Sequence, residues 1–398
     1  MSEVRGYLDE LPSELQVLIA KHLDRYSIVS FRSTSHRLLA ASHHVFVAEY
    51  FTTRVHLVSR YALRALVDIC ANPLWTAKLQ QIELVFGDIY MPKPHEIDNT
   101  RLRGKGIVKI DREYDDLFHN NYHRRLLREM FAHLNRAKRR GVAITVGRTK
   151  EDDGGPVFGY EKLERLIGCR LDLGVGHPER SQEFVRGLLT AAASTGYMFS
   201  ALSIFEGDDN RQISEGAFTI PIRLIDPLRT CWSTLTRLTL GHFQDGWYGG
   251  GENHFRQLFS SAINLEEFDL RGHREVEDTM YFWMTWMKTT SLRKLWLEDM
   301  SGCEAQFVRI FEQNKAALRE VRLRDCAIHD AECWLDVFEY AARNLDLTYF
   351  IVVGPWYIPS GQTLKLAQRI LCWQHGINEK AALEQLEVLR VNDELHRV

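Results

Sequence analysis

The sequence lacks the long apolar run that a membrane span or a secretory leader requires. Residues Met1 to Glu14 include several acidic side chains and no apolar stretch. The most apolar later stretch, Leu347 to Ile358, is shorter than a spanning helix and is interrupted by Gly354 and Pro355. We therefore expect no removed leader and no passage through a membrane.

Cysteine and glycosylation sites are also scarce. The 398 residues include 7 cysteines at irregular spacing and no Asn-x-Ser/Thr triplet. This usage is typical of a reducing compartment rather than of a secreted fold held by disulfides. The expected location is the cytoplasm or the nucleus.

Neither sign of charge is in large excess. The formal net charge is -3 at pH 7, with 45% apolar and 26% charged residues. The composition is that of a globular protein, and the charge balance argues against a protein that coats nucleic acid or an anionic membrane. Nucleic acid is therefore not an expected partner.

The strong sequence signatures of catalysis are missing. The chain has no Walker-type loop, Gly-x-Ser-x-Gly, His-Glu-x-x-His or Cys-x-x-Cys. The glycines at 104–106 and 249–251 would bind phosphate only with a strand before and a helix after them. Cys326, His329 and Cys333 have a spacing compatible with zinc, but two of them also fit as ordinary packed residues. We expect a non-catalytic protein with no metal and no cofactor.

Three short helices are predicted between Leu8 and Phe51. Ser13 and Gln16 resemble a capping box behind Pro12, while Ser27 and Ser35 are expected to cap the next two helices. So small a bundle carries more apolar side chains than its core uses, so part of its surface is expected to bind a partner. The alternative is that these helices pack against the rest of the chain.

The order and spacing of these residues resemble the F-box family. The matching segments are Leu11-Pro12-Ser13-Glu14-Leu15, Leu18-Ile19, Leu23-Asp24, Ile28-Val29, Phe31-Arg32 and Ser35-His36-Arg37-Leu38. The chain departs from the family at Ser27, where Asp is frequent, and at His36, where Lys is usual. The resemblance implies that residues 8–51 bind the Skp adaptor subunit and, through it, the cullin scaffold of a ubiquitin ligase. The residues expected to contact the adaptor are Leu11, Pro12, Leu15, Leu18, Ile19, Leu23, Ile28, Phe31 and Leu38.

A Leu-x-x-Leu-x-Leu pattern recurs through the rest of the chain. Its clearest copies begin at Leu235, Leu265, Leu292 and Leu318, so the starts lie 30, 27 and 26 residues apart. Weaker copies begin at Leu79, Phe199, Leu347 and Leu383, and a doubtful one ends at Leu171-x-Leu173. Helical stretches with one apolar face lie between copies. This period predicts a strand and a helix in each unit.

Such units stack into a curved solenoid because no single unit buries its own apolar face. Cys326 also lies at the Asn/Cys position of the leucine-rich-repeat template. The predicted fold is therefore α/β: a small three-helix F-box followed by an irregular leucine-rich-repeat solenoid of strand-plus-helix units. The resemblance is to the looser arrays of F-box proteins, most like fungal members.

Two segments fall outside the pattern. Residues 52–78 are predicted to be a helical linker, and residues 87–160 an insertion within the repeat body of residues 79–398. The insertion contains a basic helix from Tyr122 to Arg140. We interpret it as a solvated helix face, with a nucleic-acid surface as the alternative.

The target of such an adaptor is expected on the inner face of the solenoid. Side chains that alternate with the buried leucines point there. The candidates are Arg237, Asp269, Arg271, Lys294, Trp296, Arg322 and Arg324. Trp296 and Arg322 form the preferred pair, unless a loop or the Tyr122 to Arg140 helix covers Trp296.

Three functions remain open on the sequence. The first is a substrate adaptor of a ubiquitin ligase, which binds an unknown protein target. The second is a leucine-rich scaffold that acts outside a ligase, and the third is an enzyme whose active residues are scattered. Association with the Skp adaptor and a cullin separates the first from the second.

Overall fold

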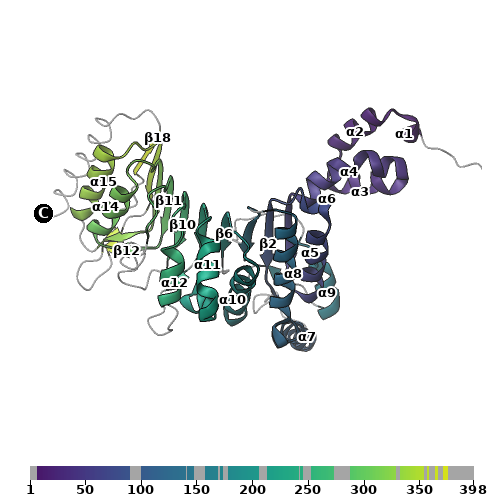
Figure 1. Cartoon of the computed structure of the whole chain (residues 1–398), viewed down its shortest axis with the longest axis horizontal. Helices are drawn as coiled ribbons and strands as arrows, with labels where there is room; N and C mark the ends of the chain where they lie inside the picture. The colour runs from purple at the N-terminus through teal and green to yellow at the C-terminus, as the bar shows by residue number, and fades with distance from the viewer. Residues whose placement is uncertain are drawn as a thin grey trace, which may run out of the picture.

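The computed structural model describes most of the chain, which forms an arch with a small helical module at one end (Figure 1). The described residues are 7–89, 100–139, 141–147, 157–168, 171–173, 178–205, 213–241, 243–244, 252–272, 287–328, 332–353, 356–357, 364–365 and 371–374.

The N-terminal module contains the three predicted helices and one additional turn. Its helices are α1 (Tyr7–Glu10), α2 (Ser13–His22), α3 (Arg25–Thr34) and α4 (His36–Phe51). The predicted cap at Ser35 is confirmed, because its side chain accepts a hydrogen bond from the Leu38 amide. The other two predicted caps are wrong. Asp24 caps α3 in place of Ser27, and Gln16 is buried and donates to the Leu8 carbonyl instead of closing a capping box.

The body is built on one ten-stranded sheet. Its order is β1-β2-β4-β6-β8-β10-β11-β13-β15-β18, and every neighbouring pair is parallel except β15 with β18. The strands are β1 (Thr53–Leu57), β2 (Gln81–Val85), β4 (Ala143–Val146), β6 (Ala201–Ile204), β8 (Arg237–Leu240), β10 (Glu267–Arg271), β11 (Lys294–Glu298), β13 (Glu320–Arg324), β15 (Tyr349–Val353) and β18 (Leu371–Gln374).

Helices cover only one face of this sheet. Along the arch they are α5 (Arg60–Ala71), α6 (Pro73–Thr76), α7 (Thr100–Phe118), α8 (Tyr122–Arg136), α9 (Tyr160–Ile167), α10 (Pro178–Thr195), α11 (Ile225–Trp232), α12 (Glu252–Phe259), α14 (Glu304–Gln313) and α15 (Glu332–Asn344), with 3-10 turns η2 (His119–Asn121), η3 (Glu215–Phe218) and η4 (Ile222–Leu224). The helices lie on the outer side of the arch, and the opposite face of the strands lines its inner side (Figure 1).

Shorter strands lie outside the main sheet. Four of them form a second sheet: β12 (Ser301–Gly302), β14 (Ala327–Ile328), β16 (Trp356–Tyr357) and β17 (Leu364–Lys365). The others form two separate pairs, in which β3 (Gly87–Ile89) pairs with β5 (Leu171–Leu173) and β7 (Ile213–Ser214) pairs with β9 (Phe243–Gln244). Cys326, next to β14, is buried at the predicted packing position, and burial raises the pKa of its thiol to about 12.

The repeating leucines form the core as the sequence predicts. In β10 the burial alternates, so that Phe268 and Leu270 face the helices while Glu267 and Asp269 face the inner side. On the next strand, β11, Leu295 and Leu297 pair in register with these two residues and are buried as well. The fold class predicted from the sequence is therefore correct: a helical module is followed by a parallel sheet of strand-plus-helix units.

Two segments differ from their predicted structure. The expected helical linker begins with β1, which pairs in parallel with β2 and starts the sheet. The expected insertion contains β4, which lies between β2 and β6 as a full member of the sheet. Conversely, Leu171 and Leu173 lie in β5, outside the main sheet, and the copy beginning at Leu383 lies outside the described residues.

The module is joined to the body by packed aromatic side chains. Phe51 at the end of α4 stacks on Trp75 of α6, with ring centroids 4.8 Å apart. Val47 and Phe51 share a small core with Ile69 of α5, and the Arg54 guanidinium donates to the Tyr50 carbonyl at 2.9 Å. Because α4 continues into β1 through one residue, this core holds the module against the first strand of the sheet.

A buried histidine makes the stability of the body sensitive to acid. His123 of α8 lies between Phe118 and Phe184 and is fully buried, and burial, with the charge of Arg124, lowers its pKa to about 4. In the unfolded chain a histidine takes up its proton near pH 6.5. The unfolded state therefore binds more protons between these values, and His123 should cost about 3 kcal/mol of stability as pH falls from 7 to 4.

We expect the variant His123→Leu to flatten this dependence. Urea midpoints measured between pH 7 and pH 4 should fall less steeply in the variant than in the natural chain. The exposed His119, changed to Leu in the same way, provides the control and should leave the slope unaltered. Equal slopes for all three chains would contradict the assignment.

Candidate interaction surfaces

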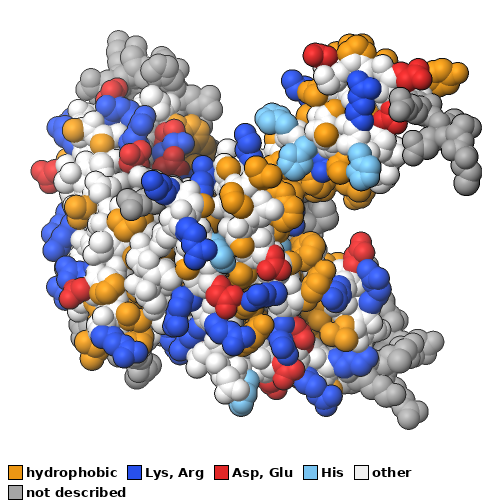
Figure 2. All heavy atoms as spheres, turned by 45° about the vertical axis from the view of Figure 1, so that its right-hand side comes forward, with side chains coloured by type: hydrophobic (Ala, Val, Ile, Leu, Met, Phe, Trp, Pro, Cys, Tyr) orange, Lys and Arg blue, Asp and Glu red, His pale blue; other side chains and the backbone are white. Residues whose placement is uncertain are grey.

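The module carries an unusual share of exposed apolar side chains. Half of the large apolar side chains that are exposed among the described residues, seven of fourteen, fall within residues 7–39. We call these seven the module surface: Tyr7, Leu8, Leu15, Leu18, Tyr26, Val29 and Leu39. Figure 2 shows orange side chains gathered on the module, away from the body. Such a concentration marks a site of protein contact.

The predicted adaptor residues divide into two groups. Pro12, Leu15 and Leu18 are exposed, and Leu11, Ile19 and Leu23 are partly buried. The remaining three, Ile28, Phe31 and Leu38, are buried inside the module, so they support its surface and are not available for direct contact. Sequence reasoning did not select five residues of the module surface: Tyr7, Leu8, Tyr26, Val29 and Leu39. The spacing of Tyr26 and Val29 could have indicated these two, because residues three apart on a helix share one face.

Arg37 fixes the start of the module surface. Its guanidinium donates to the carbonyls of Asp9 and Leu11, and the second of these contacts measures 3.1 Å. The side chain of Ser35 also binds Asp9. The Ser-x-Arg element at the start of α4 thus holds the turn that leads into Pro12 and α2.

Charged side chains form ordered rows on the inner face between β8 and β13. Strand pairing places Arg237, Glu267, Lys294 and Glu320 side by side in a first row. The same register places Thr239, Asp269, Trp296 and Arg322 in a second row. A third row contains Arg271, Glu298 and Arg324. The rows bring together all seven predicted target residues.

Ion pairs occupy the carboxylates of these rows. Lys294 Nζ lies 3.7 Å from Glu267 and 3.4 Å from Glu320. Glu298 is shared, because its carboxylate lies 3.4 Å from Arg271 Nε and 3.3 Å from Arg324 Nη1. These contacts link neighbouring strands, and they pair every carboxylate of the first and third rows with a cation.

Asp269 is the remaining carboxylate. Its Oδ1 lies 4.0 Å from Arg271 Nε. Burial raises the pKa of Asp269 to about 6, and Glu298 acts in the same direction against the opposing charges of Arg271 and Arg322. The four carboxylates of the three rows are thus each within 4 Å of a cation.

Two cations of the rows lie outside these ion pairs, although the charge of Arg322 acts on Asp269 from a greater distance. Among the described residues, the guanidinium groups of Arg237 and Arg322 make neither a salt bridge nor a hydrogen bond. Arg237 is exposed and Arg322 is half-buried. The inner face therefore presents two guanidinium groups that are available to pair with a ligand.

Trp296 lies between Asp269 and Arg322 in the second row, and 37% of it is exposed. The basic helix does not cover it, because α8 packs against α5 and α10 on the outer side of the sheet. An exposed indole beside a free guanidinium has the composition of an interface anchor.

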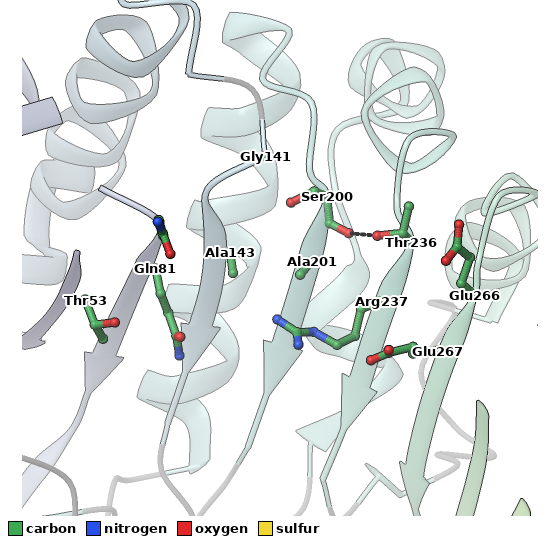
Figure 3. Close-up of a pocket in the computed structure, with 11 residues that line it drawn as sticks. Thr53, Gln81, Gly141, Ala143, Ser200, Ala201, Thr236, Arg237, Glu266 and Glu267 are labelled. Atoms are coloured by element: carbon green, nitrogen blue, oxygen red, sulfur yellow. Dashed lines mark hydrogen bonds between the residues drawn. The ribbon is translucent and has the colours of Figure 1, made fainter. Parts of the chain in front are cut away.

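A hollow of about 350 Å³ lies beside Arg237 at the N-terminal ends of the strands. Ala143 and Ala201 form its floor, while Gln81 and Arg237 stand on either side (Figure 3). In this view the Arg237 side chain extends over Ala201 toward β6. The hollow is therefore polar, open to the inner face and bordered by Arg237 and by the carboxylate residues Glu266 and Glu267.

The described residues contain no cluster of three or more histidine, cysteine or acidic side chains that could hold a metal ion. His329, one of the three possible zinc ligands, lies outside them. No helix in the described part of the chain is long and apolar enough to cross a membrane.

The basic helix α8 is largely committed to packing. Leu126, Met130 and Phe131 face the core, and two of its arginines contact carboxylates: Arg124 pairs with Glu183, and Arg125 lies 4.0 Å from Glu129. These contacts fit the predicted solvated helix face.

The chain thus combines a helical module that has an apolar surface with a leucine-rich solenoid that has a charged inner face. Residues 8–45 match the family model of the F-box domain. Among solved structures, the leucine-rich repeat-containing protein LegL7 from Legionella pneumophila is similar, with 10% identity over 85% of this chain and 93% of that chain and a TM-score of 0.30. A search of curated proteins found no match.

Proposed function

We propose that this chain is the substrate-recognition subunit of a Skp/cullin/F-box ubiquitin ligase. The observation that carries the proposal is the match of residues 8–45 to the F-box domain, together with the module surface on the same residues. In this role the module binds the Skp adaptor, and the cullin is reached through that adaptor. The chain itself performs no chemistry and works in the cytoplasm or the nucleus.

The inner face of the solenoid is the proposed site for the protein target. It supplies an exposed aromatic side chain, free cations and a polar hollow on a scaffold of paired strands. Because α4 is packed onto the first strand–helix unit, a target on this face is held in a fixed relation to the adaptor. Ubiquitin transfer requires such positioning.

Reconstitution tests the proposal directly. The purified full chain, mixed with a Skp adaptor and a cullin, should elute as one complex from a sizing column, with the three proteins in equal amounts. A chain that stays separate from the adaptor at micromolar concentration would instead support the second candidate, a leucine-rich scaffold outside a ligase.

A further inference from the structure

The charge of the inner face specifies the chemistry of its ligand. The three rows contain five cations and four carboxylates, and each carboxylate already lies within 4 Å of a cation. The rows therefore carry one positive charge in excess, and the two guanidinium groups that lie outside these ion pairs are those of Arg237 and Arg322. An anionic group of a ligand can pair with either guanidinium, whereas a basic ligand meets no carboxylate in these rows that lacks a cation.

The register of the strands sets the spacing of these two points. Arg237 on β8 and Arg322 on β13 are separated by three strand spacings and by two residues along the strand. With about 4.8 Å between strands and about 3.3 Å per residue, the separation is roughly 16 Å. An extended chain covers this distance in about five residues, and the inward curvature of the sheet shortens it slightly.

Trp296 adds an apolar contact at a defined place on this path. It is the neighbour of Arg322 in the second row, one strand closer to Arg237. A ligand that crosses the strands from Arg237 therefore meets the indole about one or two residues before it reaches Arg322. At the other end, the hollow beside Arg237 leaves room for the ligand to enter over Ala143 and Ala201.

We infer that the inner face binds an extended acidic segment of a protein, in which two anionic side chains lie four or five residues apart and an apolar side chain just precedes the second. The first anion binds Arg237, the apolar side chain packs on Trp296, and the second anion binds Arg322. The inference rests on the proposed target-binding role of this face and is independent of adaptor binding.

Peptide selection on the intact protein provides the test. The full chain is immobilised and screened with a display library of random twelve-residue peptides. We expect the selected peptides to share two Asp or Glu residues at the stated spacing, with a Leu, Ile or aromatic residue before the second. A selection without that spacing would overturn the inference.

A fluorescent synthetic peptide of the selected pattern then assigns each contact. Arg237→Glu and Arg322→Glu should each weaken its binding about ten-fold or more, and Trp296→Ala should remove the preference for the apolar residue. Arg309→Glu is the matched control, because Arg309 is an exposed arginine of α14 on the outer side. Binding to the two inner-face variants within two-fold of the natural chain would refute the assignment.

Charge exchange separates loss of contact from loss of fold. A peptide with Lys in place of its second acidic residue should bind Arg322→Glu better than it binds the natural chain, and failure of this rescue would also count against the assignment. Peptides with phosphoserine at either acidic position determine whether phosphate serves as well as carboxylate. Adaptor capture is measured on the same variants, so that failure of the adaptor role and failure of this inference give different results.

Discussion

The double variant Leu15→Asp, Leu18→Asp should lose capture of the Skp adaptor almost completely. The two side chains are 45% and 51% exposed and lie three residues apart on α2, so they present one continuous apolar ridge. If each is an interface anchor worth about 2 kcal/mol, and if a carboxylate is placed where the adaptor buries apolar surface, affinity should fall by at least ~1000-fold.

The same substitutions should leave the module folded. Its core is formed by Ala20, Phe31 and Leu38, with Ile19 and Leu23 packed around them, and neither Leu15 nor Leu18 belongs to it. Adaptor capture is measured by immobilised-adaptor binding, and folding by circular dichroism and thermal unfolding. The control pair, Ile222→Asp with Ile263→Asp, introduces the same charges at exposed apolar positions of the body and should bind the adaptor normally. Retained capture by the folded α2 variant would reject the module surface as the docking site.

The four strands that the sequence predicted most clearly, β8, β10, β11 and β13, keep leucine at one buried position. Leu240, Leu270, Leu297 and Leu323 pair in register, and each is buried on the helix-facing side of its strand. The same alignment places Trp296 and Arg322 next to each other on the inner face, so the rows of the candidate site follow from the register of the leucines.

Three strands of the main sheet were missed, β1, β4 and β18, and in the first two other residues take the place of leucine. In β4 the buried positions are Ile144 and Val146, preceded by the buried Val142. In β1 the fully buried His56 occupies such a position. Its Nδ1 lies 3.0 Å from the Ala62 carbonyl, and burial lowers its pKa to about 3. A search for alternating β-branched residues finds β4, whereas a histidine in the core has no signal in composition or period.

The module shows a different limit of sequence reasoning. The periodicity identified its helices, but each helix carries apolar side chains on more than one face. Ile28 of α3 is buried in the module while its neighbour Val29 is exposed. Which of the two becomes buried depends on the angle at which the helices cross, and the sequence does not specify that angle. The pairing of Glu298 with two arginines likewise depends on side-chain geometry that no residue pattern specifies.

Gly147→Ala should strongly destabilise the sheet where β4 meets β6. Gly147 follows β4 with a φ of +85°, and a Cβ there would stand 1.8 Å from the Phe205 carbonyl oxygen. The backbone cannot retreat without loss of pairing, because the Gly147 amide donates to Leu84 at 2.8 Å and the Phe205 amide donates to Val146 at 2.7 Å. Separation of β4 from β6, together with the strained φ, should cost at least about 3 kcal/mol.

Gly196→Ala is the matched control for this prediction. Gly196 has a φ of +65°, but a Cβ there meets no atom within 4 Å, so it should cost only the backbone strain of about 1 kcal/mol. Urea unfolding of both variants measures the difference that is due to the close approach of the two strands. Because β4 and β6 carry the floor of the hollow beside Arg237, Gly147→Ala should also weaken binding of the acidic peptide. The module has its own core, so adaptor capture should persist. Equal destabilisation by the two variants would show that the β4–β6 contact is not the constraint.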